Sequence, residues 1–286
     1  MSGPLDDIVA TIAETAPDVR GGLAGRRVYE SGANPSGETQ LAADVYADEL
    51  LAERLLGVEG VSAYASEERG SVRHSDGNGD GAYRVAVDPL DGSSNLRSNN
   101  AMGTLFAVYD EPLPAPGAAV VASGFVLYGP ITTMVVARDG TVTESVVEDD
   151  GTRRVVDPDL TLPDEPTVYG FGGRVPQWSN AFAAYVEAVE SELKLRYGGA
   201  MIADVNQVLT HGGVFGYPGL ADRPEGKLRL CFEGHPIAHV VESAGGASSN
   251  GDRSLLACTP GGLHDRTPLF VGDERYIERL EAALSG

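Results

Sequence analysis

The sequence predicts a mixed α/β (α+β) protein, in which a mostly antiparallel N-terminal sheet with helices is followed by a C-terminal half of alternating strands and helices. Some segments repeat apolar residues every three or four positions, as helices do, and others alternate apolar with polar residues, as strands do. A stretch rich in Asp, Pro and Gly, residues 148–166, separates the two kinds of pattern. We therefore expect two halves, residues 1–160 and 161–286.

Helix and strand patterns follow one another through the N-terminal half. An amphipathic stretch opens the chain, and we expect Gly21-Gly22-Leu23-Ala24-Gly25 to break it. Apolar spacings of three and four predict a helix over residues 40–56. Alternation over residues 82–87 predicts a strand that Pro89 ends, because proline donates no ladder hydrogen bond. Further strands are expected at residues 104–109, 118–127 and 131–137. Asp139-Gly140 predicts a hairpin turn after the last of them.

The C-terminal half has an α/β pattern. Helices are predicted over residues 179–194 and near 201–210. A strand is predicted over residues 228–232, with Glu233 at its end. A helix over residues 236–244 begins with Pro236, which suits the first turn of a helix because its missing N–H would have no partner there.

The composition excludes some classes of partner. The 286 residues contain 42 Asp and Glu against 21 Lys and Arg, a formal net charge of −21. With 42% hydrophobic residues the chain can bury a substantial core. We expect no nucleic acid and no anionic membrane as partner, because both require a basic surface.

Lysine is almost absent. Among the basic residues only Lys194 and Lys227 are lysines, and the others are arginines. A strongly acidic chain with so little lysine is predicted to be adapted to high salt, where screening weakens the repulsion among its own charges. The alternative is an ordinary acidic cytosolic protein.

The expected cellular location and the expected state of the cysteines rest on motifs that the sequence lacks. The first residues carry neither a basic region nor an apolar run, and no stretch approaches a membrane span of about 18 apolar residues. We expect a cytoplasmic protein. Cys231 and Cys258 have no metal-type spacing and are expected to be free thiols in a reducing compartment.

The segment Asp88-Pro89-Leu90-Asp91-Gly92-Ser93-Ser94-Asn95 has the strongest functional signal. Two carboxylates and the Leu90 carbonyl across a turn are hard oxygen ligands, which favour Mg²⁺ or Mn²⁺ over zinc. Gly92 permits a sharp turn, and Ser93 and Ser94 can cap a following helix whose free N–H groups would face a phosphate. The alternative is a simple capped turn.

Further acids occur after two other predicted strands. Glu67 and Glu68 follow the apolar run of residues 61–65, and Glu233 follows residues 228–232. Adjacent glutamates are usually solvated charge. However, chemistry with several divalent cations requires several carboxylates that converge from different strands.

Together these motifs resemble those of class I fructose-1,6-bisphosphatases, in the lithium-sensitive, inositol monophosphatase-like superfamily. The resemblance extends from about Ser31 to Gly272. Its landmarks are Gly37-Glu38-Thr39-Gln40 with Asp44, Ser66-Glu67-Glu68, Asp88 to Asn95, Arg196-Tyr197, Met201, Ala203-Asp204, Tyr217-Pro218, Gly226 to Leu230, Glu233 and His264 to Phe270.

The resemblance implies a layered α-β-α-β-α sugar-phosphatase sandwich. It also implies a gluconeogenic activity, the Mg²⁺-dependent hydrolysis of the 1-phosphate of fructose 1,6-bisphosphate. Two or three Mg²⁺ ions per subunit, which Mn²⁺ can replace, would be held by Glu67, Asp88, the Leu90 carbonyl, Asp91 and Glu233. Asp44 and Glu68 would activate the attacking water, with Asp91 beside them.

The resemblance also implies substrate contacts. Asp91, Gly92, Ser93 and Ser94 match the site of the 1-phosphate, and Arg229 matches a basic residue near it. Tyr197, Tyr217 and Lys227 match contacts to the sugar and its 6-phosphate. Arg196 matches a residue that reaches the 6-phosphate of a neighbouring subunit, which implies a homodimer or homotetramer. The segment 169–178 lacks the family's usual Asn and Tyr, and we expect Arg174 to substitute as a phosphate contact.

Two other activities remain as alternatives on the same fold. One is an inositol monophosphatase-like enzyme, whose relatives usually carry a Trp-Asp-x-Ala-Ala-Gly-type motif where this chain has Cys231 to Pro236. The other is a sedoheptulose-bisphosphate phosphatase. A catalytically inactive metal-binding protein would be favoured by a missing acid, and none is missing from the set.

Overall fold

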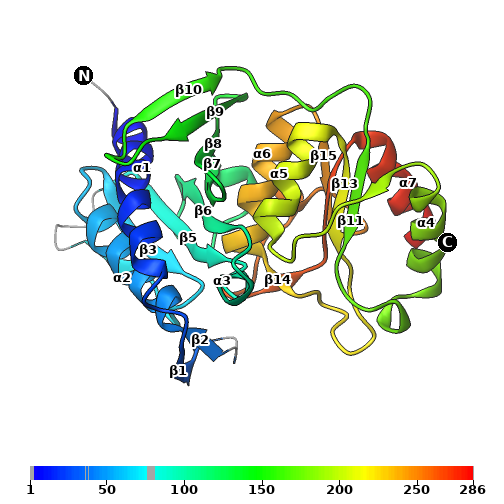
Figure 1. Ribbon diagram of the computed structural model, residues 1–286, viewed down its shortest axis with the longest axis horizontal. Coiled ribbons are helices and arrows are strands. Elements are labelled where there is room, and N and C mark those ends of the chain that lie inside the picture. Colours follow the sequence, from blue (N-terminus) through cyan, green and yellow to red (C-terminus); the bar gives the residue numbers. More distant parts are fainter. Residues whose placement is uncertain (1–2, 36, 38, 76–80, 286) are drawn as a thin grey trace.

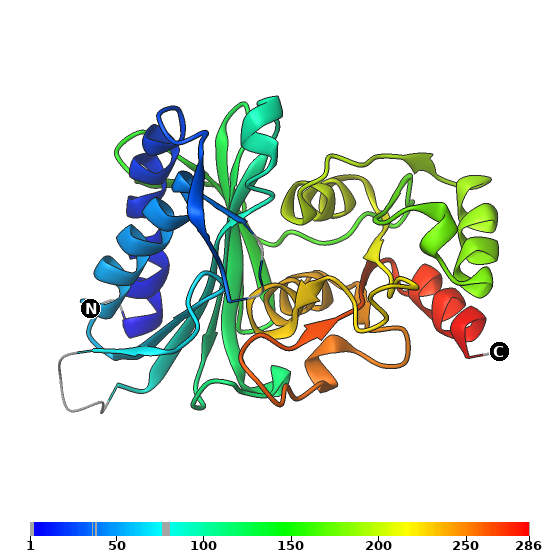
Figure 2. The same ribbon diagram turned by 90° about the horizontal axis from the view of Figure 1, so that it is seen from below.

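Helices and sheets alternate in five layers along the long axis of the molecule, as Figures 1 and 2 show. The structure is a computed structural model and describes residues 3–35, 37, 39–75 and 81–285. The layers are α1 with α2, an eight-stranded sheet, α5 with α6, a five-stranded sheet, and α4 with α7. This arrangement confirms the predicted α-β-α-β-α sandwich.

The eight-stranded sheet forms most of the N-terminal half and has the order β10-β9-β8-β7-β6-β5-β3-β4. Its strands are β3 (Val61–Ser66), β4 (Arg73–His74), β5 (Tyr83–Asp91), β6 (Met102–Tyr109), β7 (Val120–Tyr128), β8 (Thr132–Arg138), β9 (Thr141–Val147) and β10 (Arg153–Asp157). All neighbours are antiparallel except β3 and β5, which are parallel. Helices α1 (Pro4–Leu23) and α2 (Ala42–Leu56) cover one face through a shared apolar core.

The five-stranded sheet of the C-terminal half is mixed and has the order β12-β11-β13-β17-β15. Its strands are β11 (Val168–Phe171), β12 (Lys194–Leu195), β13 (Gly213–Tyr217), β15 (Ala247–Ser249) and β17 (Leu269–Gly272). Helices α5 (Met201–His211) and α6 (His235–Ser243) lie between the two sheets, and α4 (Asn180–Glu190) and α7 (Glu274–Leu284) cover the outer face. The sheets are therefore joined by one layer of buried helices.

The described chain also contains short elements outside the two large sheets. They are the strand pairs β1 (Tyr29–Ala33) with β2 (Thr39–Leu41) and β14 (Leu228–Arg229) with β16 (Arg266–Thr267), and the one-turn helix α3 (Asn95–Ser98). None of the helices in the described residues combines the length and apolar character of a membrane span. Cys231 is buried, Cys258 is half-buried, and both are free thiols, as expected.

Several predicted elements occur with small shifts at their ends. The helix expected over residues 40–56 is α2, and the three strands expected after residue 104 are β6, β7 and β8. The hairpin turn joins β8 to β9, and both its residues have positive φ, 53° at Asp139 and 75° at Gly140. Such a pair suits a two-residue hairpin because its backbone twist matches that of the strands.

The expected break falls inside the segment Gly21 to Gly25, because α1 ends at Leu23, although the helix continues through both Gly21 and Gly22. A Cβ on Gly22 would lie 2.3 Å from a ring carbon of Tyr46 on α2. The glycine is therefore a packing residue, since its missing side chain makes room for the ring of the neighbouring helix. The burial of Val19 and Leu23 on the same helix offsets the intrinsic cost of glycine, about 1 kcal/mol per residue.

Pro89 interrupts the ladder of β5 but does not end the strand. Asp88 pairs with Leu105 and Asp91 pairs with Gly103, so two residues of β5 lie opposite one residue of β6. This is the geometry of a β-bulge, which bends a strand and redirects its side chains. The two acids therefore lie within the last residues of β5, on either side of the bulge.

The strand predicted over residues 228–232 is also wrong in part. Only Leu228 and Arg229 form a strand, β14, and Leu230–Gly234 form a π-helical turn that leads directly into α6. The Arg229 N–H donates to the Glu233 carboxylate at 2.5 Å, which closes this wide turn. A short apolar run does not distinguish a strand from a buried helical turn, so periodicity alone is ambiguous here.

Candidate active site

A cavity of about 310 Å³ lies where α2, the end of β5, the start of α5 and the π-helical turn meet. Most of the predicted site residues line it, and they come from both halves of the chain. The lining includes Asp44, Glu67, Glu68, Asp88, Leu90, Asp91, Gly92, Ser93, Ser94, Tyr217, Lys227, Arg229 and Glu233. We call this cavity the acidic pocket.

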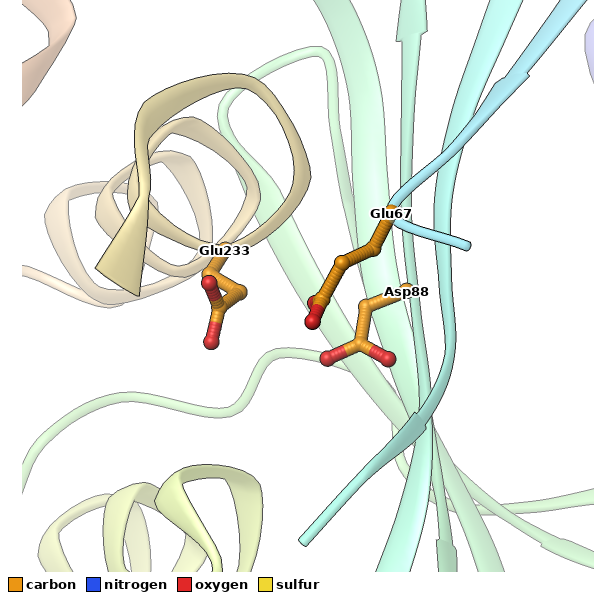
Figure 3. Close-up of side chains that lie close together, drawn as sticks. All are labelled: Glu67, Asp88 and Glu233. Carbon is orange, nitrogen blue, oxygen red and sulfur yellow. The ribbon is translucent and has the colours of Figure 1, made fainter. Parts of the chain in front are cut away.

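Three carboxylates converge in the acidic pocket (Figure 3). Glu67 follows β3, Asp88 lies on β5 and Glu233 lies on the π-helical turn, and each offers an oxygen within 4.8 Å of the others. All three are buried, with exposed fractions of 7%, 4% and 3% respectively. Buried carboxylates at this spacing repel one another unless a cation or a proton lies between them.

Arg229 places positive charge beside two of the three acids. Arg229, which is 2% exposed, lies with its Nη1 2.9 Å from Glu67 and 3.8 Å from Glu233. Burial, followed by the charge of Glu67, raises the pKa of Glu233 to about 8. Burial and the neighbouring acids also raise the pKa of Asp88 well above its usual range. An oxygen-only donor set with excess negative charge fits a hard divalent cation.

Asp91 and the Leu90 carbonyl are adjacent to this cluster and have partners of their own. The Asp91 carboxylate accepts a hydrogen bond of 2.7 Å from the backbone N–H of Ile202 at the start of α5. Burial raises the pKa of Asp91 to about 7. The Leu90 carbonyl accepts from the Ser93 N–H at 3.1 Å, which leaves it a second lone pair for a cation. Asp91 is not among the three carboxylates that approach within 4.8 Å in the described chain.

Asp44 and Glu68 lie beside the cluster as a second pair of acids. Asp44 is in the first turn of α2, where it accepts from the Leu41 N–H at 2.7 Å and from the Ser93 hydroxyl. Burial raises the pKa of Asp44 to about 6. Burial also raises the pKa of Glu68 to about 7, although the side-chain amide of Gln40 donates to its carboxylate. Both carboxylates can therefore exchange a proton near neutral pH.

The Gly92 to Ser94 segment forms a tight turn against α5. Gly92 has φ of 74°, and a Cβ there would lie 2.2 Å from the Cβ of Ala200. Only glycine combines this backbone conformation with so close a neighbour. The predicted helix after this turn is the single turn α3, and the Ser94 side chain makes no capping hydrogen bond. Ser93 and Ser94 both line the pocket, and Ser94 does not act as a helix cap.

The sugar-side residues continue from this pocket into a second cavity of about 640 Å³. Tyr217, Lys227 and Gly199 line both cavities, and Tyr197 and Arg174 line the second. The Tyr197 and Tyr217 hydroxyls are 2.9 Å apart, and the Lys227 ammonium lies 5.3 Å from the centre of the Tyr217 ring. We call this second space the outer cavity.

Two predicted substrate contacts have other surroundings in this chain. Arg229 is packed against Glu67 and Glu233, so its guanidinium balances the acids. Arg196 is exposed just after β12 and lines neither cavity of its own chain. A role for Arg196 in a neighbouring subunit stays a prediction.

Other residues of the site have no signal in the sequence. The backbone N–H of Ile202 and the turn residue Arg223 reach the site through the packing of distant segments. An ion pair of 2.6 Å between the half-buried Arg69 and the buried Asp48 joins the Glu67-Glu68 segment to α2. The His264 Nε2 donates to the Arg69 carbonyl at 2.9 Å. A single Asp, Arg or His in a polar stretch gives no reason to expect these contacts.

A buried oxygen-rich pocket with serine hydroxyls and a lysine, held between two sheets, defines a class of site suited to a divalent cation and a phosphate ester. Models of the N-terminal and C-terminal domains of fructose-1-6-bisphosphatase match residues 19–156 and 162–285. The chain belongs to the class 1 fructose-1,6-bisphosphatase family.

Individual relatives agree with this assignment. The class 1 fructose-1,6-bisphosphatase of Natronomonas pharaonis is 72% identical over 99% of this chain and 100% of its own length. That of Halobacterium salinarum is 58% identical over 99% of this chain and 98% of its own. A holo crystal structure of Leishmania major fructose-1,6-bisphosphatase superimposes with a TM-score of 0.92 at 27% identity, covering 99% of this chain and 94% of the other.

Proposed function

We propose that this protein hydrolyses the 1-phosphate ester of fructose 1,6-bisphosphate, releasing fructose 6-phosphate and phosphate, with Mg²⁺ as its cofactor. The observation that carries the proposal is the convergence of Glu67, Asp88 and Glu233 in a member of this family. The neighbouring Ser93 and Ser94 supply donors for the phosphate on the same wall.

The donor set supports two or three Mg²⁺ ions, which Mn²⁺ can replace. Their ligands would be the carboxylates of Glu67, Asp88, Asp91 and Glu233 and the carbonyl of Leu90. When bound, such cations neutralise charge on the phosphoryl group and on the leaving oxygen.

The chain's own residues then bind the ester and move one proton. Gly92, Ser93 and Ser94 would hold the reacting phosphate, and Tyr217 and Lys227 would hold the sugar side. Glu68, with a pKa of about 7, and Asp44, with a pKa of about 6, can take the proton of the attacking water. Both pKa values lie close to neutral pH, which suits a general base.

Residues 1–160 would thus supply most of the acids, and residues 161–286 would supply the sugar contacts together with Glu233. The exposed position of Arg196 supports a homodimer or homotetramer in which it reaches a neighbour's site. The match to class 1 fructose-1,6-bisphosphatases supports a gluconeogenic enzyme, and a cytoplasmic location is part of the same proposal.

The test measures phosphate release from fructose 1,6-bisphosphate, sedoheptulose 1,7-bisphosphate and inositol 1-phosphate, at high salt, with Mg²⁺ or with EDTA. We expect kcat/KM for fructose 1,6-bisphosphate to exceed that for inositol 1-phosphate at least about 100-fold, because only the former can contact the sugar-side residues with a second phosphate. EDTA should abolish turnover. Equal values for the two substrates would contradict the proposal.

A further inference from the structure

The outer cavity is an extension of the acidic pocket. Gly199, Tyr217 and Lys227 line both, so a ligand held at the three carboxylates can extend past the Tyr217 ring into the larger space. A sugar bisphosphate bound with its reacting phosphate at the acids has to place its second phosphate away from them.

The charge of the outer cavity is opposite to that of the whole chain. Its lining contains Arg174, Arg223 and Lys227 but only one acid, Asp222, in a chain of formal net charge −21. Most arginines of the described chain form ion pairs or bond to backbone carbonyls, as Arg138 does with Asp6. The guanidinium groups of Arg174 and Arg223 make no hydrogen bond or ion pair with any described residue.

The two segments that carry these arginines are fixed against each other. The Ala221 N–H donates to the Gln177 carbonyl at 2.9 Å, and the Gln177 side-chain amide donates to the Asp222 carboxylate at 3.0 Å. Gly173 packs on Leu220, since a Cβ there would lie 2.7 Å from a Leu220 methyl carbon. Asp222, the one acid of the cavity, is thus engaged by Gln177.

Arg223 itself lies in a closed turn. Its N–H donates to the Leu220 carbonyl at 2.9 Å, and its carbonyl accepts from the Leu220 N–H at 3.0 Å. The Gly226 N–H also donates to the Arg223 carbonyl, at 3.1 Å, just before Lys227. The backbone of Arg223 is therefore held close to that of Lys227, which lines both cavities.

We infer that Arg223, together with Arg174, binds the phosphate of the substrate that is not hydrolysed, and so selects bisphosphates over monophosphates. The inference rests on the proposed function. An uncommitted guanidinium presents paired N–H donors that match two oxygens of a phosphate dianion, whereas Lys227 offers a single point of charge. Arg223 is then a specificity residue of the outer cavity, without a part in the bond-breaking step.

The experiment compares Arg223→Gln with the wild type on two substrates, fructose 1,6-bisphosphate and fructose 1-phosphate, which lacks the second phosphate. We expect kcat/KM for the bisphosphate to fall about 10- to 100-fold, the loss typical of one charged hydrogen-bonding partner, mainly through KM. The value for fructose 1-phosphate should be unchanged. Arg223→Lys should recover part of the loss, because it restores the charge without the fork of donors.

Arg174→Gln tests the same inference from the other segment, in case the turn around Arg223 does not tolerate substitution. The matched control is Arg253→Gln, because Arg253 pairs with Asp252 at 2.8 Å and lines neither cavity. Melting temperatures of all variants show that each is folded.

A second readout is independent of turnover. The dissociation constant of fructose 6-phosphate, measured by calorimetry, should rise by the same factor in Arg223→Gln. The inference would be overturned if kcat/KM fell equally for fructose 1,6-bisphosphate and fructose 1-phosphate, or if it fell for neither. If the wild type were inactive on fructose 1,6-bisphosphate, the proposed function would be overturned instead. The dissociation constant of fructose 6-phosphate would still test whether Arg223 binds that phosphate.

Discussion

The acidic pocket and the outer cavity adjoin each other, and the side chains that line them carry mainly opposite charges. The pocket gathers buried acids, among them Glu67, Asp88 and Glu233, around Arg229. The outer cavity gathers Arg174, Arg223 and Lys227 and has one acid, Asp222. The acids of the pocket are buried apart from the half-buried Glu68, whereas Arg223 is half-buried and Arg174 is exposed.

This difference shows how an acidic protein can bind a highly anionic molecule. In the pocket, burial removes water from the carboxylates, so they require a cation and can then present positive charge to a phosphate. In the outer cavity the arginines remain hydrated until an anion arrives, so they cost little while the site is empty. Changes in the pocket should therefore affect turnover, and changes in the outer cavity should affect binding.

The largest expected effect comes from Asp91→Asn in the acidic pocket. The substitution keeps the shape of the side chain and removes the charge of an expected cation ligand. We expect kcat to fall about 1,000-fold or more, the scale of losing a charge that stabilises the transition state. Steady-state kinetics at saturating Mg²⁺ and substrate measure it, with circular dichroism to show an intact fold.

The matched control is Asp222→Asn, the same chemical change in the outer cavity. Because Asp222 lies among cations and away from the carboxylate cluster, kcat should change less than about threefold. Near-normal turnover in Asp91→Asn would contradict its assignment to the cation site. A large loss of kcat in Asp222→Asn would remove the distinction between the two cavities.

Salt should have the next largest effect, on the whole molecule. The formal net charge of −21 makes the folded chain repel itself at low ionic strength, and salt screens this repulsion. We expect the melting temperature to rise by on the order of 10 °C between about 0.1 M and 2 M KCl. An optimum of activity and melting temperature near about 0.1 M would contradict adaptation to salt.

Cation removal should have a smaller effect that depends on pH. Asp91, with a pKa of about 7, and Glu233, with a pKa of about 8, hold protons in the folded state that the unfolded chain has released. The contribution of these two acids to the stability of the cation-free protein is therefore lost as the pH rises through these values. Over this window the buried His235, with a pKa lowered to about 4, stays neutral.

The measurement is the melting temperature with EDTA and with Mg²⁺ at about pH 6.5 and pH 8.5. With EDTA it should fall by several degrees over this interval. With Mg²⁺ it should stay nearly level, because the cation takes over the neutralising role of the protons. A stabilisation by Mg²⁺ that is no greater at the higher pH would show that these acids do not hold the cation.

Much of the fold could be predicted because local signals agree with the tertiary structure. The apolar residues whose spacing predicted α2 form the face that this helix buries in the core beside the large sheet. Asp139-Gly140 forms the hairpin turn between β8 and β9, as expected. The exact ends of elements differed from expectation where packing overrides a local rule. Gly22 stays in α1 because the Tyr46 ring requires the space, and β5 continues past Pro89 because a bulge absorbs the interruption.

The candidate site also has features that the sequence predicted and features that it did not. Motif spacing identified the residue types, from the Asp88 to Asn95 segment to Glu233, because hard-cation and phosphate chemistry restricts which side chains can serve. The sequence alone thereby determined the family resemblance and the acidic character, and it predicted the candidate donors. It did not reveal that Arg229 pairs with two of the acids, or that Arg223 lies beside Lys227 in the outer cavity.

Those contacts join residues far apart along the chain. Glu67 and Glu233 meet because β3 and the π-helical turn are brought together by two packed layers, and Ile202 reaches Asp91 because α5 begins against Gly92. Local patterning reports the period of an element and the chemistry of its side chains. Which elements face each other depends on the burial of apolar surface over the whole molecule, and only the tertiary structure decided how one acidic chain forms an acidic pocket beside a basic cavity.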